Sequence, residues 1–292
     1  MSADRVVGTA AGPSRDDTDD PPTTMAGGPR GPWWARLDRR TTALVLGVEA
    51  ILILVVWQVA IGTFGLVSPV FLPPPLEILD GFGTLVARAD MLQHLGTSLW
   101  VWSLGFGLAV VVGVALGILT GASVPVDRLS TPVLWTIYAT PWLAYRPLSV
   151  VWFGFGLAPI VFLVFIASVF PVLLNTAAGV RSVDPSLLAA SRVFGIPRLR
   201  MYRTILLPSA LPFVIVGMRQ SAVMATISLI VAEMTGSSIG LGALVGILTS
   251  RYQTGQAFAL VVIAVLWTVG IGQLLKAIGR RVAPWQTDAR LA

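Results

Sequence analysis

Apolar residues gather in six long stretches between residue 41 and residue 277, and polar, glycine-rich or proline-rich connections separate these stretches. An apolar segment of about 20 residues is long enough to cross the hydrocarbon core of a bilayer as a helix. The expected spans are 41–62, 96–120, 131–152, 159–178, 211–232 and 257–277. The pattern therefore predicts an all-α, polytopic membrane protein with about six transmembrane helices.

The composition supports a membrane protein and removes several classes of site. The mean hydropathy is +0.82, and 12% of residues are charged, about half the share that is usual in soluble domains. The chain has no cysteine, which excludes disulfides, thiolate zinc sites and iron–sulfur clusters. His94 is the single histidine, so we expect no metal site.

The two ends of the chain differ from the apolar core. Residues 1–40 are rich in Gly, Pro, Ser, Thr and Asp and lack apolar periodicity, which predicts a disordered tail. The first apolar stretch begins too late for a typical cleaved signal peptide and is interpreted as a membrane anchor. We expect a transmembrane domain over 41–283 and a short tail over 284–292.

Basic residues predict the orientation. An even number of spans places both termini on one side of the membrane. Arginines concentrate on that side, above all in the polar loop 179–207, whereas the opposite side receives only Arg88 and Arg251. Positively charged loops stay in the cytoplasm. Both termini and the 179–207 loop are therefore expected to be cytoplasmic.

Catalytic motifs are missing from the sequence. No G-x-x-x-x-G-K-[ST] phosphate loop is present, and Lys276 is the only lysine, so P-loop ATP hydrolysis is not expected of this chain. G-x-S-x-G and H-E-x-x-H patterns are also absent, which argues against a membrane hydrolase. We expect no enzymatic activity, and any ATPase would be a partner subunit.

One motif lies in the 179–207 loop, where Ala-Ala-Ser-Arg-Val-Phe-Gly at 189–195 is followed, after nine residues, by Ile-Leu-Leu-Pro at 205–208. It resembles the signature E-A-A-x3-G-x9-I-x-L-P of bacterial ABC-importer permeases. Ala189 stands where that signature has glutamate, which removes one possible salt bridge to the ATPase. A helix, a turn at Gly195 and a second helix that starts near Pro197 would form a rigid knob.

The resemblance extends from about residue 71 to residue 285 and implies the type I ABC importer permease fold in a bacterial inner membrane. It also implies a dimer, expected as two identical copies, with two cytoplasmic ATPase subunits that bind ATP and Mg, and an extracytoplasmic substrate-binding protein. The knob would dock in the ATPase. The residues assigned to this coupling role are Ala189, Ala190, Ser191, Gly195, Ile196, Pro197, Arg198 and Arg200.

Three segments, 141–156, 170–185 and 231–242, resemble permeases for nitrate, taurine and alkanesulfonates most closely. The same scaffold serves importers of aromatic acids and of pyrimidine vitamin precursors, and these substrates remain alternatives. A secondary transporter, which would need ion-coupling carboxylates and often an inverted repeat, and a receptor-like membrane protein are the rival classes. Association with an ATPase would distinguish the importer from both.

Two arginines fall inside expected spans, where a charge is costly and usually faces a cavity or a partner. Arg146 and Arg219 are assigned to the substrate pathway of an anionic solute; the alternative is a pair with Glu233 or with helix-end carbonyls. Glu233 follows Arg219 by 14 residues, about four helical turns, and is expected at an outer gate or in packing, with substrate contact in the pathway as the alternative.

Aromatic residues and the histidine complete the candidates. Tyr138, Trp142 and Tyr145 would share one face of a continuous third span and line the pore, or else belong to an interfacial belt. His94 is expected as a hydrogen-bonding residue at the membrane interface, with a ligand or pH-sensing role as the alternative.

Overall fold

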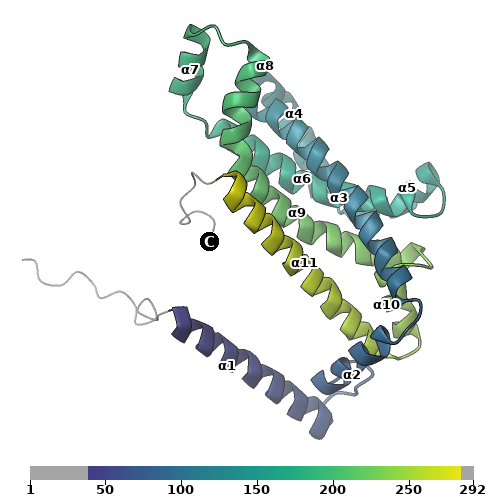
Figure 1. Cartoon of the computed structure of the whole chain (residues 1–292). Coiled ribbons are helices and arrows are strands. Elements are labelled where there is room, and N and C mark those ends of the chain that lie inside the picture. The colour runs from purple at the N-terminus through teal and green to yellow at the C-terminus, as the bar shows by residue number, and fades with distance from the viewer. Residues whose placement is uncertain (1–38, 284–292) are drawn as a thin grey trace, which may run out of the picture. The chain divides into compact units, whose positions relative to one another are not determined.

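A computed structural model describes residues 39–283, and every regular element within this range is a helix (Figure 1). The expected tails over 1–38 and 284–292 lie outside the described residues. The chain forms two compact units, residues 1–53 and residues 54–292. The first unit contains most of helix α1, and the architecture below is that of the second.

The described range contains eleven α-helices and three short helices of the π or 3₁₀ type, which carry the label η. They are α1 (Arg39–Trp57), η2 (Gln58–Thr63), α2 (Pro75–Val86), α3 (Met91–Ala122), α4 (Val124–Ala139), η3 (Trp142–Tyr145), α5 (Arg146–Phe153), α6 (Ala158–Arg181), α7 (Pro185–Val193), α8 (Arg198–Met201), η4 (Tyr202–Leu206), α9 (Leu207–Gly236), α10 (Leu241–Ser250) and α11 (Thr254–Val282).

Five helical segments of the described range are long and apolar enough to cross a membrane: Thr41–Thr63, Met91–Ala122, Ala158–Arg181, Leu199–Gly236 and Thr254–Val282. They contain five of the six expected spans, and the all-α, polytopic fold is confirmed. The apolar segment between the last two spans holds the short helix α10.

The expected continuous helix over 131–152 is wrong. Helix α4 ends at Ala139, and Thr140 has the extended angles φ −74° and ψ 125°. The cause is Pro141, because the proline ring disfavours the α conformation of the residue before it. The chain resumes in η3 and α5, so two short helices replace one span.

The packing of α3 on α6 shows that this interrupted segment still returns across the bundle. Gly105 of α3 lies against Val164 of α6, and Gly117 lies against Thr176. The two helices therefore run parallel, and the chain between them must cross back. Helix α9 runs antiparallel to α6, since Ser221 donates a hydrogen bond to the carbonyl of Ser168 while Gly179 lies against Phe213.

Glycine lets α3 and α6 approach closely. A Cβ atom on Gly105, Gly113, Gly117 or Gly121 would come within 2.6–2.9 Å of its nearest atom of α6. Small residues serve this purpose in membrane helices, where packing rather than water expulsion holds helices together. Gly107, on another face of α3, has no atom within 4 Å of such a Cβ.

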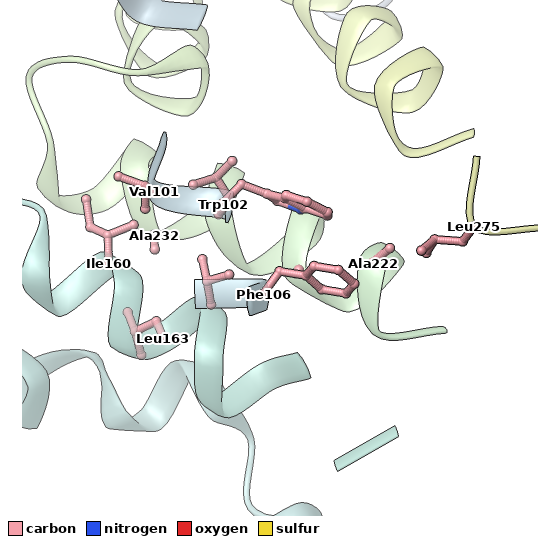
Figure 2. Packing of buried hydrophobic residues seen from close by; sticks show 11 residues of the cluster. Val101, Trp102, Phe106, Ile160, Leu163, Ala222, Ala232 and Leu275 are labelled. Atoms are coloured by element: carbon pink, nitrogen blue, oxygen red, sulfur yellow. The ribbon is translucent and has the colours of Figure 1, made fainter. Parts of the chain in front are cut away.

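A buried apolar cluster joins α3, α6, α9 and α11 in the middle of the bundle (Figure 2). Trp102 stacks on Phe106 with ring centroids 4.5 Å apart. The indole N–H of Trp102 donates to the hydroxyl of Thr226 at 3.1 Å, which satisfies the polar end of this large side chain. The cluster packs these four helices of the unit against one another.

Candidate functional site

The segment that carries the permease-like motif lies at one end of the bundle, at the top of Figure 1, as a pair of short helices, α7 and α8. Gly195 follows α7 with φ +66°, and the N–H of Ile196 donates to the carbonyl of Ser191 at 3.0 Å. This bond spans six residues and closes a helix in the Schellman manner, which needs the left-handed conformation that glycine tolerates. The structure therefore has the expected turn between two helices.

The start of α7 is fixed by local chemistry. Asp184 precedes Pro185, the first helical residue, and its carboxylate accepts the N–H of Ser186 at 2.8 Å. This hydrogen bond lowers the pKa of Asp184 below its usual value, as expected for a carboxylate at a helix N-cap. Proline at the first helical position is favourable because its missing N–H is not needed there.

The α7–α8 pair has a buried base, where residues 183 and 206 join it to the ends of α6 and α9, and an exposed tip at residues 193 and 194. Val183 and Leu206 are buried in a cluster between the ends of α6 and α9, and Ser191 is 3% exposed and donates to the carbonyl of Leu188. Val193 and Phe194 are 86% and 81% exposed. Large exposed apolar side chains beside a polar surface mark contact sites for a partner.

The other residues assigned to coupling lie around this tip. Ala189 and Ala190 are exposed on α7, Pro197 immediately precedes α8, and Arg200 is exposed on it. The side chain of Arg198 is outside the described part of the chain.

Arg146 begins α5, and its guanidinium lies against Gly236 at the last turn of α9, where a Cβ atom would collide with it. No carboxylate pairs with Arg146 among residues 39–283. The expected alternative of a pair with Glu233 is therefore not what the structure contains. A half-buried cation at a helix C-terminus benefits from the helix dipole and keeps its hydrogen-bond donors available.

Arg219 occupies a separate place. It lines a groove of about 470 Å³ between α9 and α11 with Gln220 and Gln273, and the amide of Asn175 donates to Gln220 at 2.9 Å. Within the described range Arg219 has no ion pair. Seventeen residues of α9 separate it from Gly236, about 25 Å along the helix, so the two arginines do not form one site.

The three candidate aromatic residues do not share a helical face, contrary to expectation. Tyr138 is on α4 and packs against Phe170 at 5.4 Å between ring centroids. Trp142 and Tyr145 lie in η3, beyond the break, and pack against the cluster around Trp102. The expectation failed because Pro141 ends the helix that would have aligned them.

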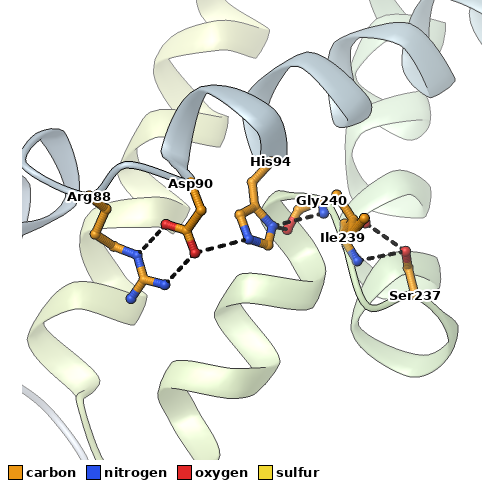
Figure 3. Close-up of polar contacts among 6 residues, drawn as sticks. All are labelled: Arg88, Asp90, His94, Ser237, Ile239 and Gly240. Atoms are coloured by element: carbon orange, nitrogen blue, oxygen red, sulfur yellow. Dashed lines mark hydrogen bonds and ion pairs between the residues drawn. The ribbon is translucent and has the colours of Figure 1, made fainter.

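Glu233 is buried in a polar node that the sequence did not reveal. Its carboxylate accepts hydrogen bonds from Ser98 at 2.8 and 2.9 Å and from the N–H of Gly242 at 2.8 Å. His94 is 7% exposed and bonds to the backbone of Gly240 (Figure 3). His94 and Ser98 are four residues apart on α3 and so share a face, the one signal available beforehand.

Comparison with known proteins shows which family has this sequence and fold. The family described as "Binding-protein-dependent transport system inner membrane component" matches residues 109–287. The taurine transport system permease protein TauC of Escherichia coli is 33% identical over 267 residues, which cover 88% of this chain and 94% of the relative. The nitrate import permease protein NrtB of Leptolyngbya laminosa is 28% identical over 66% of this chain and 70% of the relative.

A solved amino acid ABC transporter shares the fold, with a TM-score of 0.54 and 21% identity over 70% of this chain and 97% of that chain. The family match covers more than half of the chain, and the taurine relative spans most of it. The chain therefore belongs to the family of inner membrane components of binding-protein-dependent transport systems, the multi-pass permease components of ABC importers.

Proposed function

We propose that this chain forms the translocation pathway of an ATP-driven importer for a small anionic solute of the nitrate, taurine or sulfonate kind. The observation that carries the proposal is the exposed helix–turn–helix of α7, Gly195 and α8 at one end of the bundle. The nitrate and taurine relatives support the solute class.

The α7–α8 pair is suited to receive force from a separate ATPase. Its apolar tip at Val193 and Phe194 is exposed, while its base is packed between α6 and α9. A push on the tip therefore reaches the two helices that also pack against each other and against α3. Two ATPase subunits, which bind ATP and Mg, would each dock on one permease of a pair, with two identical copies as the working arrangement.

Charge distribution supports an orientation with the α7–α8 end in the cytoplasm. Arg200 and Arg203 lie in this segment, and Arg280 and Arg281 end α11, which reaches the same end of the bundle because Gly279 packs on Ile215 near the start of α9. Basic residues favour the cytoplasmic side. The binding protein would deliver solute to the opposite, outer end.

Arg146 supports an anionic solute. It lies near that outer end with its guanidinium over Gly236 and without a carboxylate partner in the described part of the chain. Arginine binds carboxylate, sulfonate and nitrate oxygens through paired N–H donors. Burial without a fixed counter-charge leaves this cation available to a passing anion.

The coupling role is tested by removing the apolar tip. The double variant Val193→Ser/Phe194→Ser, co-expressed with the partner ATPase and binding protein, should lose ATPase co-purification and stimulated hydrolysis in nanodiscs. Phe155→Ser is the matched control, because Phe155 is 94% exposed near the opposite end. Normal ATPase association in the double variant would refute the coupling role.

The solute class is tested with a panel of loaded binding protein: nitrate, taurine, an alkanesulfonate, an aromatic carboxylate and a pyrimidine. Arg146→Gln should lower uptake of the stimulating anion about tenfold or more, since a hydrogen bond to a charged group is worth about 1.5–3 kcal/mol. Arg251→Gln, an exposed arginine near the same end, should stay within about twofold. Equal uptake by both variants would remove Arg146 from the pathway.

A further inference from the structure

The N-terminal end of α10 is held by side chains of two other helices. The N–H of Gly240 donates to His94 Nδ1 at 3.0 Å, that of Leu241 to Ser98 Oγ at 2.7 Å, and that of Gly242 to Glu233 Oε2 at 2.8 Å. The first N–H groups of a helix have no partner within it. Here α3 and α9 supply all three acceptors, and Figure 3 shows the histidine contact.

Glu233 links the three acceptors into one network. Its side chain is 0% exposed, and the hydroxyl of Ser98 donates to both carboxylate oxygens. No lysine or arginine pairs with it among the side chains that the structure describes. The donors that face the carboxylate are Ser98 and the positive end of α10, which favours a negative charge.

The approach of α10 to this network is close. A Cβ atom on Gly242 would collide with the carbonyl of Ile230 and lie 2.8 Å from the Cβ of Glu233. Gly240 has φ +130°, and a Cβ there would meet the Glu233 carboxylate. Both glycines are therefore required for the end of α10 to sit between α3 and α9.

The network lies at the end of the bundle opposite α7 and α8, and α3 connects the two ends. Helix α3 has 32 residues, about 48 Å, and its glycine-lined face packs along α6. At the outer end its first turns carry His94 and Ser98. Attachment of α10 to this helix would let a displacement of the α7–α8 end reach α10 along α3.

We propose that His94, Ser98 and Glu233 are positioning residues that latch α10 and the loop 237–240 onto α3 and α9, so that the outer end moves as one rigid body during the transport cycle. The inference rests on the proposed coupling to an ATPase. The latch itself is a property of the permease and is measured without ATP.

The first experiment measures release of α10. Because the chain has no cysteine, Ala243→Cys, at a position 3% exposed on α10, gives a single reporter thiol whose maleimide labelling reports detachment. Adding Ser98→Ala leaves the Leu241 N–H without an acceptor and should raise the labelling rate about tenfold. Ser103→Ala, an exposed serine on the same helix, should leave the rate unchanged.

Glu233→Gln in the same background should raise the labelling rate as well. A glutamine amide has one oxygen that accepts hydrogen bonds, whereas both carboxylate oxygens of Glu233 accept from Ser98 or Gly242. Helical content and yield of each variant establish that it is folded, and Ser98→Ala decides the question if Glu233→Gln is not produced. A labelling rate in Ser98→Ala equal to that in Ser103→Ala would overturn the latch.

The second experiment measures transmission in the complete importer. Ser98→Ala without the reporter should keep stimulated ATP hydrolysis but import at least threefold less solute per ATP, whereas Ser103→Ala should keep the parental ratio. Faster labelling with an unchanged ratio would overturn transmission. Absence of any ATPase from the parental complex would refute the proposed function, while the labelling assay would still report on the latch.

Discussion

The close packing of α3 on α6 makes a defined prediction for Gly117→Ala. The added Cβ would lie 2.6 Å from Thr176 Cβ and 2.7 Å from the carbonyl oxygen of Leu173. Carbon atoms reach their optimal separation at about 3.5 Å or more, so the helices must separate by roughly 0.9 Å at this contact. The backbone carbonyl cannot rotate away as a flexible side chain would.

The cost follows from the loss of neighbouring contacts. A gap of about 0.5–1 Å removes a quarter to a half of each dispersion contact, and Gly113 and Gly121 lie on the same face one turn away. Overpacking of this kind costs about 1–3 kcal/mol. Replacing glycine by alanine in a helix interior also stabilises the folded state by about 0.5–1 kcal/mol. A control variant must contain the same gain so that the cost of the contact can be isolated.

Gly107→Ala supplies that control. Gly107 is on the same helix as Gly117, and a Cβ atom added there meets no atom within 4 Å. Unfolding in mixed micelles with increasing dodecyl sulfate, followed by tryptophan fluorescence, should give Gly117→Ala a free energy of unfolding about 1–3 kcal/mol below that of Gly107→Ala. Equal midpoints for the two variants would refute the close approach of α3 and α6.

Two further predictions concern the ends of the bundle. Gly195→Asn should retain stimulated ATP hydrolysis, whereas Gly195→Val should lose it several-fold, because asparagine tolerates the φ of +66° and a β-branched residue does not; equal activities would argue against a required turn. A hydrogen bond from Arg88 lowers the pKa of Asp90 to about 2, against an ordinary value of 3.8. This contribution to stability is present above pH 4 and lost as pH falls towards 2. In Asp90→Asn, the free energy of unfolding should therefore depend less on pH between pH 4 and pH 2 than in the parental protein.

Much of the fold could be predicted because hydropathy reports the length of each span. The five long apolar helices were expected near their observed positions, and the turn at Gly195 was expected from the spacing of one motif. The third span failed because hydropathy does not register backbone conformation. Residues on both sides of Pro141 are apolar, and only the steric effect of proline on Thr140 divides them.

The candidate site was harder to predict because its contacts are distant in sequence. Ser98 and Glu233 are 135 residues apart, and His94 and Gly240 are 146 apart. The expected relation of Arg219 to Glu233 used helical phase alone. Four turns along one helix separate them by about 21 Å, so a shared face could not make them partners.

The break between α4 and α5 also determines what can surround the protein. Asp127 and Arg128 are in the first turns of α4, so the helix enters the apolar region near residue 131 and ends at Ala139, about 12 Å in. Backbone groups freed at that depth cannot be left against hydrocarbon, where nothing hydrogen-bonds to them. Pro141 and Ala139 are nevertheless exposed on the single chain. This side of the permease is therefore suited to face water or another protein chain, which the proposed pairing of two copies would supply.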